Sequence, residues 1–227
     1  MPDPVPNAEL LRSLGRLVRG LSALFWGLPI GLIVCFHTAK ADVLRSFGVF
    51  PPIISTGLLV FGLWQLSDFQ KQERVWRHAL DRAGILSLIL FFLSPFFYFS
   101  NKMPDNTFFI VMVIVGAVAG MLLLASLNVV LQRLGAMLPD EALRIETRQF
   151  TALNLNLLLA ASVLVLAYFG LSQLPSLPRW LRVVVAVIDR GTWWFLIPLL
   201  LLPVAMTMAL LWKTKEVILD NVFGAER

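Results

Sequence analysis

The chain has few of the residues from which catalytic and metal sites are commonly built. Among 227 residues there is one cysteine, Cys35, and neither of the two histidines, His37 and His78, has a partner at metal-ligand spacing. The strings GxSxG, HExxH, GxxxxGKS/T and CxxC are absent, and with them the usual signatures of serine hydrolases, zinc proteases, phosphate loops and thiol redox proteins. The sequence therefore predicts no metal, no cofactor and no intramolecular disulfide.

Charge is scarce as well. Charged residues make up 15% of the chain and hydrophobic residues 58%, and the mean hydropathy of +0.80 is far above that of a soluble protein. The charges lie between the long apolar runs and never inside them. Because proton relays and ion-coupled sites need ionisable groups within the membrane, this distribution argues against such functions.

Long uncharged runs dominate what remains. Each is long enough to cross the ~30 Å hydrocarbon core of a bilayer as a helix. We therefore predict an all-α integral membrane protein that forms one domain over residues 1–227, a bundle of six transmembrane helices. The predicted spans are residues 20–39, 50–67, 83–101, 107–132, 152–173 and 192–212.

Amphipathic segments precede spans 1, 3 and 5. A charged face and an apolar face at helical spacing are combined in residues 7–19 and 70–83, and less cleanly in residues 141–150. They predict interfacial helices that lie on the membrane surface before the chain turns into the bilayer. For the first segment, the alternative is a helix packed on the rest of the protein, because periodicity does not distinguish lipid from protein as the apolar partner.

The distribution of basic residues predicts the topology. Thirteen of the 19 lysines and arginines lie before span 1, between spans 2 and 3, between spans 4 and 5, or after span 6. The positive-inside rule then places both termini in the cytoplasm, in a bacterial inner membrane or an equivalent membrane. It also accounts for the net charge of +5, so we expect no nucleic-acid partner. Ala39-Lys40-Ala41 resembles a signal-peptidase site, but the spans that follow favour a retained first helix.

Pairs of glycines predict where helices approach closely. Gly27 and Gly31 flank Pro29 in span 1, and Gly116 and Gly120 form a GxxxG step in span 4. Small residues at this spacing let a second helix backbone come near. We expect all four glycines at helix contacts, either within the bundle or between protomers.

A set of polar residues is expected near the cytoplasmic ends of the spans. The amides have two interpretations: they bridge neighbouring helices, or together with the charged residues they form a shallow site for a polar ligand, a lipid headgroup or a loop of a partner protein. The set comprises Gln65, Asp68, Glu73, Arg77, Asn128, Gln132, Glu141, Arg144, Arg148, Asn154 and Asn156.

Three functions fit this pattern. The favoured one is a non-enzymatic accessory or scaffold subunit of a membrane complex, whose basic helices hold anionic lipid headgroups and a protein partner or a second copy, with Trp76 and Arg77 as contacts. The alternative is a small-solute transporter or the substrate-binding subunit of one. Its candidate path is lined by prolines 29, 95, 198 and 203 with Gln65, Asn128 and Asn156. The third is a membrane enzyme acting on lipid through residues in its cytoplasmic loops.

Overall fold

The computed structural model describes residues 8–40, 42–69, 73–138, 141–172 and 201–220. Within these ranges the chain is helical and contains no strand. The elements are α1 (Ala8–Lys40), the 3-10 helix η1 (Asp42–Phe47), α2 (Phe50–Leu66), α3 (Arg74–Lys102), α4 (Thr107–Met137), α5 (Glu141–Ser172) and a C-terminal helix over residues 201–220.

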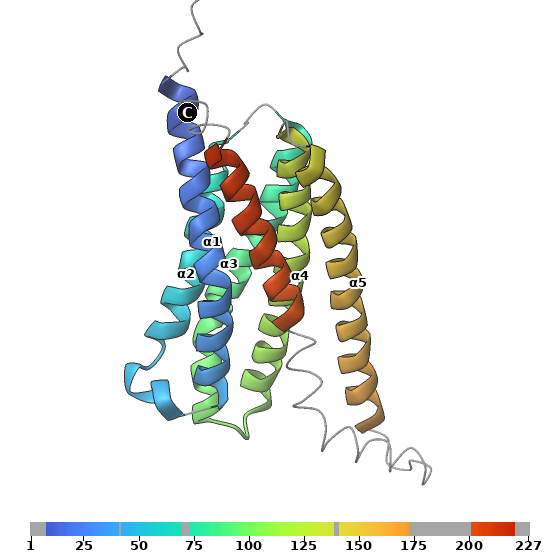
Figure 1. The fold of residues 1–227 in the computed structure, drawn as a ribbon. Coiled ribbons are helices and arrows are strands. Elements are labelled where there is room, and N and C mark those ends of the chain that lie inside the picture. The colour runs from blue at the N-terminus through green and yellow to red at the C-terminus, as the bar shows by residue number, and fades with distance from the viewer. Residues whose placement is uncertain (1–7, 41, 70–72, 139–140, 173–200, 221–227) are drawn as a thin grey trace, which may run out of the picture.

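The long helices stand side by side and alternate in direction (Figure 1). The start of α1, the connections from α2 to α3 and from α4 to α5, and the end of the C-terminal helix all lie at one end, the upper end in Figure 1. The connections from α1 to α2 and from α3 to α4 lie at the lower end. The described chain therefore begins and finishes at the same end of the bundle.

Three helices are long and apolar enough to cross a membrane, namely residues Arg12–Ala39 of α1, all of α3 and all of α4. The helix α2 is apolar but shorter, with 17 residues. Predicted span 5 lies within α5 except for residue 173, which is outside the described residues. Of predicted span 6, residues 192–200 are also outside the described residues, and residues 201–212 are helical. The chain is thus a helical membrane protein, and the count of six spans stays a prediction.

The amphipathic segments are not separate helices in the structure. Residues 8–19, 74–83 and 141–150 of these segments form the first turns of longer helices, because α1, α3 and α5 run without a break through the expected turns near residues 20, 83 and 152. The reason is clearest in α1, where Leu17 and Leu21 continue into Leu24 and Leu28 at helical spacing and all four are buried. The apolar face of this segment therefore packs on protein.

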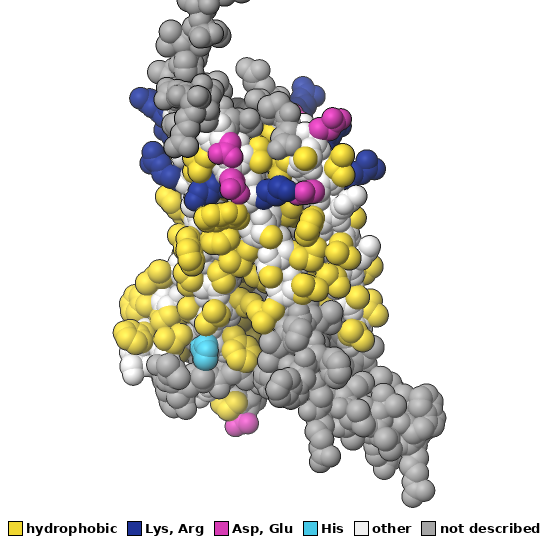
Figure 2. All heavy atoms as spheres, viewed as in Figure 1, with side chains coloured by type: hydrophobic (Ala, Val, Ile, Leu, Met, Phe, Trp, Pro, Cys, Tyr) yellow, Lys and Arg dark blue, Asp and Glu magenta, His cyan; other side chains and the backbone are white. Residues whose placement is uncertain are grey.

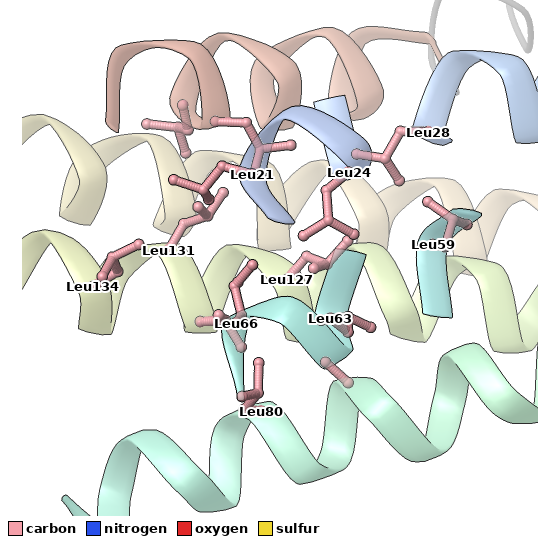
Figure 3. Close-up of a cluster of buried hydrophobic side chains, with 14 of the residues drawn as sticks. Leu21, Leu24, Leu28, Leu59, Leu63, Leu66, Leu80, Leu127, Leu131 and Leu134 are labelled. Carbon is pink, nitrogen blue, oxygen red and sulfur yellow. The ribbon is translucent and has the colours of Figure 1, made fainter. Parts of the chain in front are cut away.

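Leucines from several helices fill the core (Figure 3). The C-terminal helix joins them through Leu210, Leu211 and Ile218, so it extends past the predicted end of span 6 at residue 212. Ile218 is 1% exposed, which shows that the last turns pack against the bundle. The labelled leucines are Leu21, Leu24 and Leu28 of α1, Leu59, Leu63 and Leu66 of α2, Leu80 of α3, and Leu127, Leu131 and Leu134 of α4.

The outside of the bundle is apolar along its middle. Figure 2 shows a belt of hydrophobic side chains below a band of charged side chains at the upper end. Large apolar side chains are strongly exposed on several helices, including Phe92 of α3 at 70% and Leu159 of α5 at 65%. A surface of this kind matches the hydrocarbon of a bilayer and would be costly in water.

Candidate functional site

The members of the predicted polar set lie in different environments. Asn128 and Asn154 are buried together in the interior, whereas Asn156 on the same helix as Asn154 is exposed. Asp68 forms an ion pair with Arg16 of α1. Of the others, Gln65, Glu73 and Gln132 are half-buried, and Arg77, Glu141, Arg144 and Arg148 are exposed.

The two buried asparagines meet at one threonine. The side-chain nitrogens of Asn128 on α4 and Asn154 on α5 each donate a hydrogen bond to the hydroxyl of Thr207 on the C-terminal helix, both at 2.9 Å. Thr207 donates in turn to the carbonyl of Pro203 at 2.8 Å. The hydroxyl of Thr151 donates to the backbone carbonyl of Asn128 at 3.2 Å. We call Asn128, Thr151, Asn154 and Thr207 the amide node, which ties three helices together.

The amide node is incompletely satisfied. The side-chain oxygens of Asn128 and Asn154 are buried and accept no hydrogen bond from the residues that the structure describes. An unpaired buried acceptor costs about 1–3 kcal/mol, so these oxygens are places where a donor from a ligand or from water would be favourable. The node thus has a structural role and leaves two unpaired acceptors in the interior of the bundle.

A hollow opens between α3 and α4 near the charged end. It has a volume of about 290 Å³. Its polar lining consists of Ser126 and three basic side chains, His78, Arg82 and Arg133, which are exposed. The apolar lining is Val75 and Ala79 of α3 with Val129 of α4. We call this hollow the α3–α4 groove, and no acidic side chain lines it among the described residues.

The positive charges of the two groove arginines are not compensated by an ion pair among the described residues. Arg16 pairs with Asp68, and Lys213 of the C-terminal helix pairs with Glu146 of α5. Within the described ranges neither Arg82 nor Arg133 forms an ion pair. The groove therefore carries an excess of positive charge.

Trp76 is not available as the surface contact that its sequence position suggested. Its side chain is 1% exposed, and its indole N–H donates to the carbonyl of Phe69 at 3.0 Å. The rings of Phe69 and Trp76 also meet edge to face, with centroids 6.2 Å apart. The large apolar ring is buried because the first turns of α3 pack on the bundle. Arg77, the next residue, is exposed.

The predicted glycine contacts are of unequal closeness. A Cβ on Gly27 would lie 2.9 Å from the side chain of Leu59, and one on Gly31 would lie 3.8 Å from it. A Cβ on Gly116 would lie 3.1 Å from the ring of Phe97. A Cβ on Gly120 would meet no described atom within 4 Å other than those of its own stretch of helix.

Sequence reasoning missed several residues of these sites. Thr207 follows Pro203 by one helical turn inside an apolar run, and nothing distinguished it from the many threonines that bond to their own helix. Arg82 and His78 are one turn apart on α3, which indicated a common face. That Arg133 of α4 lines the same hollow could be found only from the three-dimensional structure. Comparison with known proteins gives no guide here, because no family model, curated protein or solved structure matches the chain.

Proposed function

We propose that the protein is an accessory or scaffold subunit of a membrane complex, with its charged end in the cytoplasm and in contact with an acidic surface of a partner protein. The observation that supports this role is a set of exposed arginines, each of which directly follows a buried residue. Arg77 follows Trp76, Arg144 follows Leu143 and Arg148 follows Thr147; the exposed fractions of the three buried residues are 1%, 0% and 0%.

This arrangement fixes the backbone from which each arginine projects. Thr147 also lies against α4, since a Cβ on Gly135 would be 2.9 Å from the Thr147 hydroxyl. Less conformational freedom is then lost when a partner binds, which favours affinity. Exposed arginines give specificity for carboxylates because their guanidinium groups form two parallel hydrogen bonds. The natural partner of this end is therefore an acidic protein surface.

Site-specific photocrosslinking tests this proposal in native membranes. A photoreactive phenylalanine at position 144 should form an adduct of one defined mass with a single protein. The same residue at position 92, on the exposed apolar surface of α3, serves as the control because Phe92 is 70% exposed but faces the expected lipid. The adduct at position 144 should disappear when Arg148 is replaced by glutamate. If positions 144 and 92 give the same products, the scaffold proposal is wrong.

The amide node favours transport as a second candidate function. Its two unpaired oxygens, on Asn128 of α4 and Asn154 of α5, lie beside the C-terminal helix, which contains Pro203, and could accept hydrogen bonds from a polar solute. Purification in mild detergent followed by metabolite identification tests this. A bound polar metabolite in the absence of a protein partner, lost in Asn128→Leu, would favour transport over the scaffold role.

A further inference from the structure

We infer that the α3–α4 groove is a binding site for the phosphate of an anionic glycerophospholipid whose acyl chains run along α3 and α4. The inference rests on the membrane placement in the proposed function and does not depend on the partner protein.

The charge of the groove selects an anion. Arg82 from α3 and Arg133 from α4 approach the same hollow from two helices, and His78 lies one turn from Arg82. With no carboxylate in the lining among the described residues, a phosphate is the group that compensates these side chains. The two ion pairs described above lie outside this lining. A zwitterionic headgroup would bind less favourably, because its own cation would come close to the arginines and repel them.

The size of the groove fits a headgroup and excludes a whole lipid. Its volume of about 290 Å³ is near the lower limit for small-molecule pockets, which is roughly 300 Å³. The valine and alanine side chains in its wall suit the glycerol and the first methylene groups of a lipid. The chains must then lie outside the groove.

Exposed apolar rows continue from the groove toward the middle of the membrane. On α3 the row after Arg82 is Ile85, Ile89 and Phe92, with exposed fractions of 59%, 40% and 70%. On α4 the row before Ser126 is Leu122 and Val118. Residues three and four apart share a helix face, so both rows lie on the groove side. The ten residue-to-residue steps from Arg82 to Phe92 span ~15 Å along the helix, about half of the ~30 Å hydrocarbon thickness.

Native mass spectrometry of the purified protein in a neutral detergent tests the site. Phosphatidylglycerol and phosphatidylcholine with identical chains are titrated separately. We expect phosphatidylglycerol to be retained and phosphatidylcholine to be lost. The double variant Arg82→Gln/Arg133→Gln should bind phosphatidylglycerol about 30-fold more weakly, since each basic residue near a membrane surface contributes roughly a fivefold factor.

Matched controls separate this site from general surface charge. Arg12→Gln/Arg19→Gln removes two exposed arginines of α1 at the same end and should leave binding unchanged. Ser126→Phe fills the groove, keeps both arginines and should abolish binding, with circular dichroism and gel filtration to verify folding. Glycerol 3-phosphate, which has the headgroup chemistry without chains, should not compete.

Four results would overturn the inference: equal retention of the two lipids, equal loss in the α1 control, normal binding by Ser126→Phe, or full competition by glycerol 3-phosphate. The last would assign the groove to a free phosphate compound. No partner protein is present in the lipid-binding experiment, so a negative result there does not bear on the crosslinking at position 144. Likewise, a negative crosslinking result does not bear on lipid binding.

Discussion

The backbones of Gly20 on α1 and Gly62 on α2 face each other at very close range. A Cβ on Gly20 would lie 2.8 Å from the carbonyl oxygen of Gly62, and a Cβ on Gly62 would lie 3.1 Å from the carbonyl oxygen of Gly20. Atoms of a rigid backbone cannot move aside as a side chain can. This reciprocal contact sets the distance between the first two long helices.

Gly62→Ala should therefore destabilise the bundle. The added methyl would also meet the side chain of Leu24 at 2.8 Å, and overpacking of this kind costs about 1–3 kcal/mol. The melting temperature in mild detergent should fall. Gly120→Ala is the control, since no described atom lies within 4 Å of its Cβ position and alanine favours a helix. The close contact would be refuted if both variants melted like the wild type.

Thr207→Val should loosen the contact between α4, α5 and the C-terminal helix. The substitution preserves shape but removes the acceptor for both Asn128 and Asn154, which would leave two buried N–H donors with fewer partners. We expect a loss of about 1–3 kcal/mol in unfolding free energy. Thr207→Ser retains the hydroxyl and should cost less. Equal stability of the valine and serine variants would show that the node contributes no net energy.

Substitutions at Trp76 and Arg77 should differ in their effect on stability, because Trp76 is buried and Arg77 is exposed. Trp76→Ala removes a fully buried ring together with its hydrogen bond to Phe69 and should cost about 3–5 kcal/mol. Arg77→Ala removes an exposed side chain and should change stability by less than about 0.5 kcal/mol. Detergent melting curves measure both effects. A large loss of stability in Arg77→Ala would mean that this arginine is structural and unsuited to the proposed partner surface.

The lower helix ends could be predicted from the sequence because strong local signals mark them. Gly48 adopts a φ of 62° just before α2, and Pro51 and Pro52 fall in the first turn of that helix. Asn106 caps α4, its side chain accepting a hydrogen bond from the amide of Phe108 at 3.0 Å. Helix-breaking and helix-capping residues act on the local backbone, so the helix ends that they mark can be recognised from the sequence alone.

The helix ends at the upper, charged end of the bundle could not be predicted from the sequence in the same way. A change from charged to apolar side chains, as after Arg19 or Arg82, does not interrupt backbone hydrogen bonds, and the helices continue through it. The candidate sites depend on pairings between distant segments, such as Asn128 with Thr207 and Arg82 with Arg133. Hydropathy and charge identify the residue types available for such sites, but only packing decides which of them meet.

Single-cysteine labelling tests most directly that the charged end lies in the cytoplasm and the α3–α4 connection on the other side of the membrane. Cys35→Ser supplies a background without cysteine, and Lys102→Cys and Arg144→Cys place one thiol at an exposed position at each end. In intact spheroplasts, a membrane-impermeant maleimide should label position 102 and should label position 144 only after the membrane is opened. Labelling of position 144 from outside, or identical behaviour of the two positions, would contradict the account.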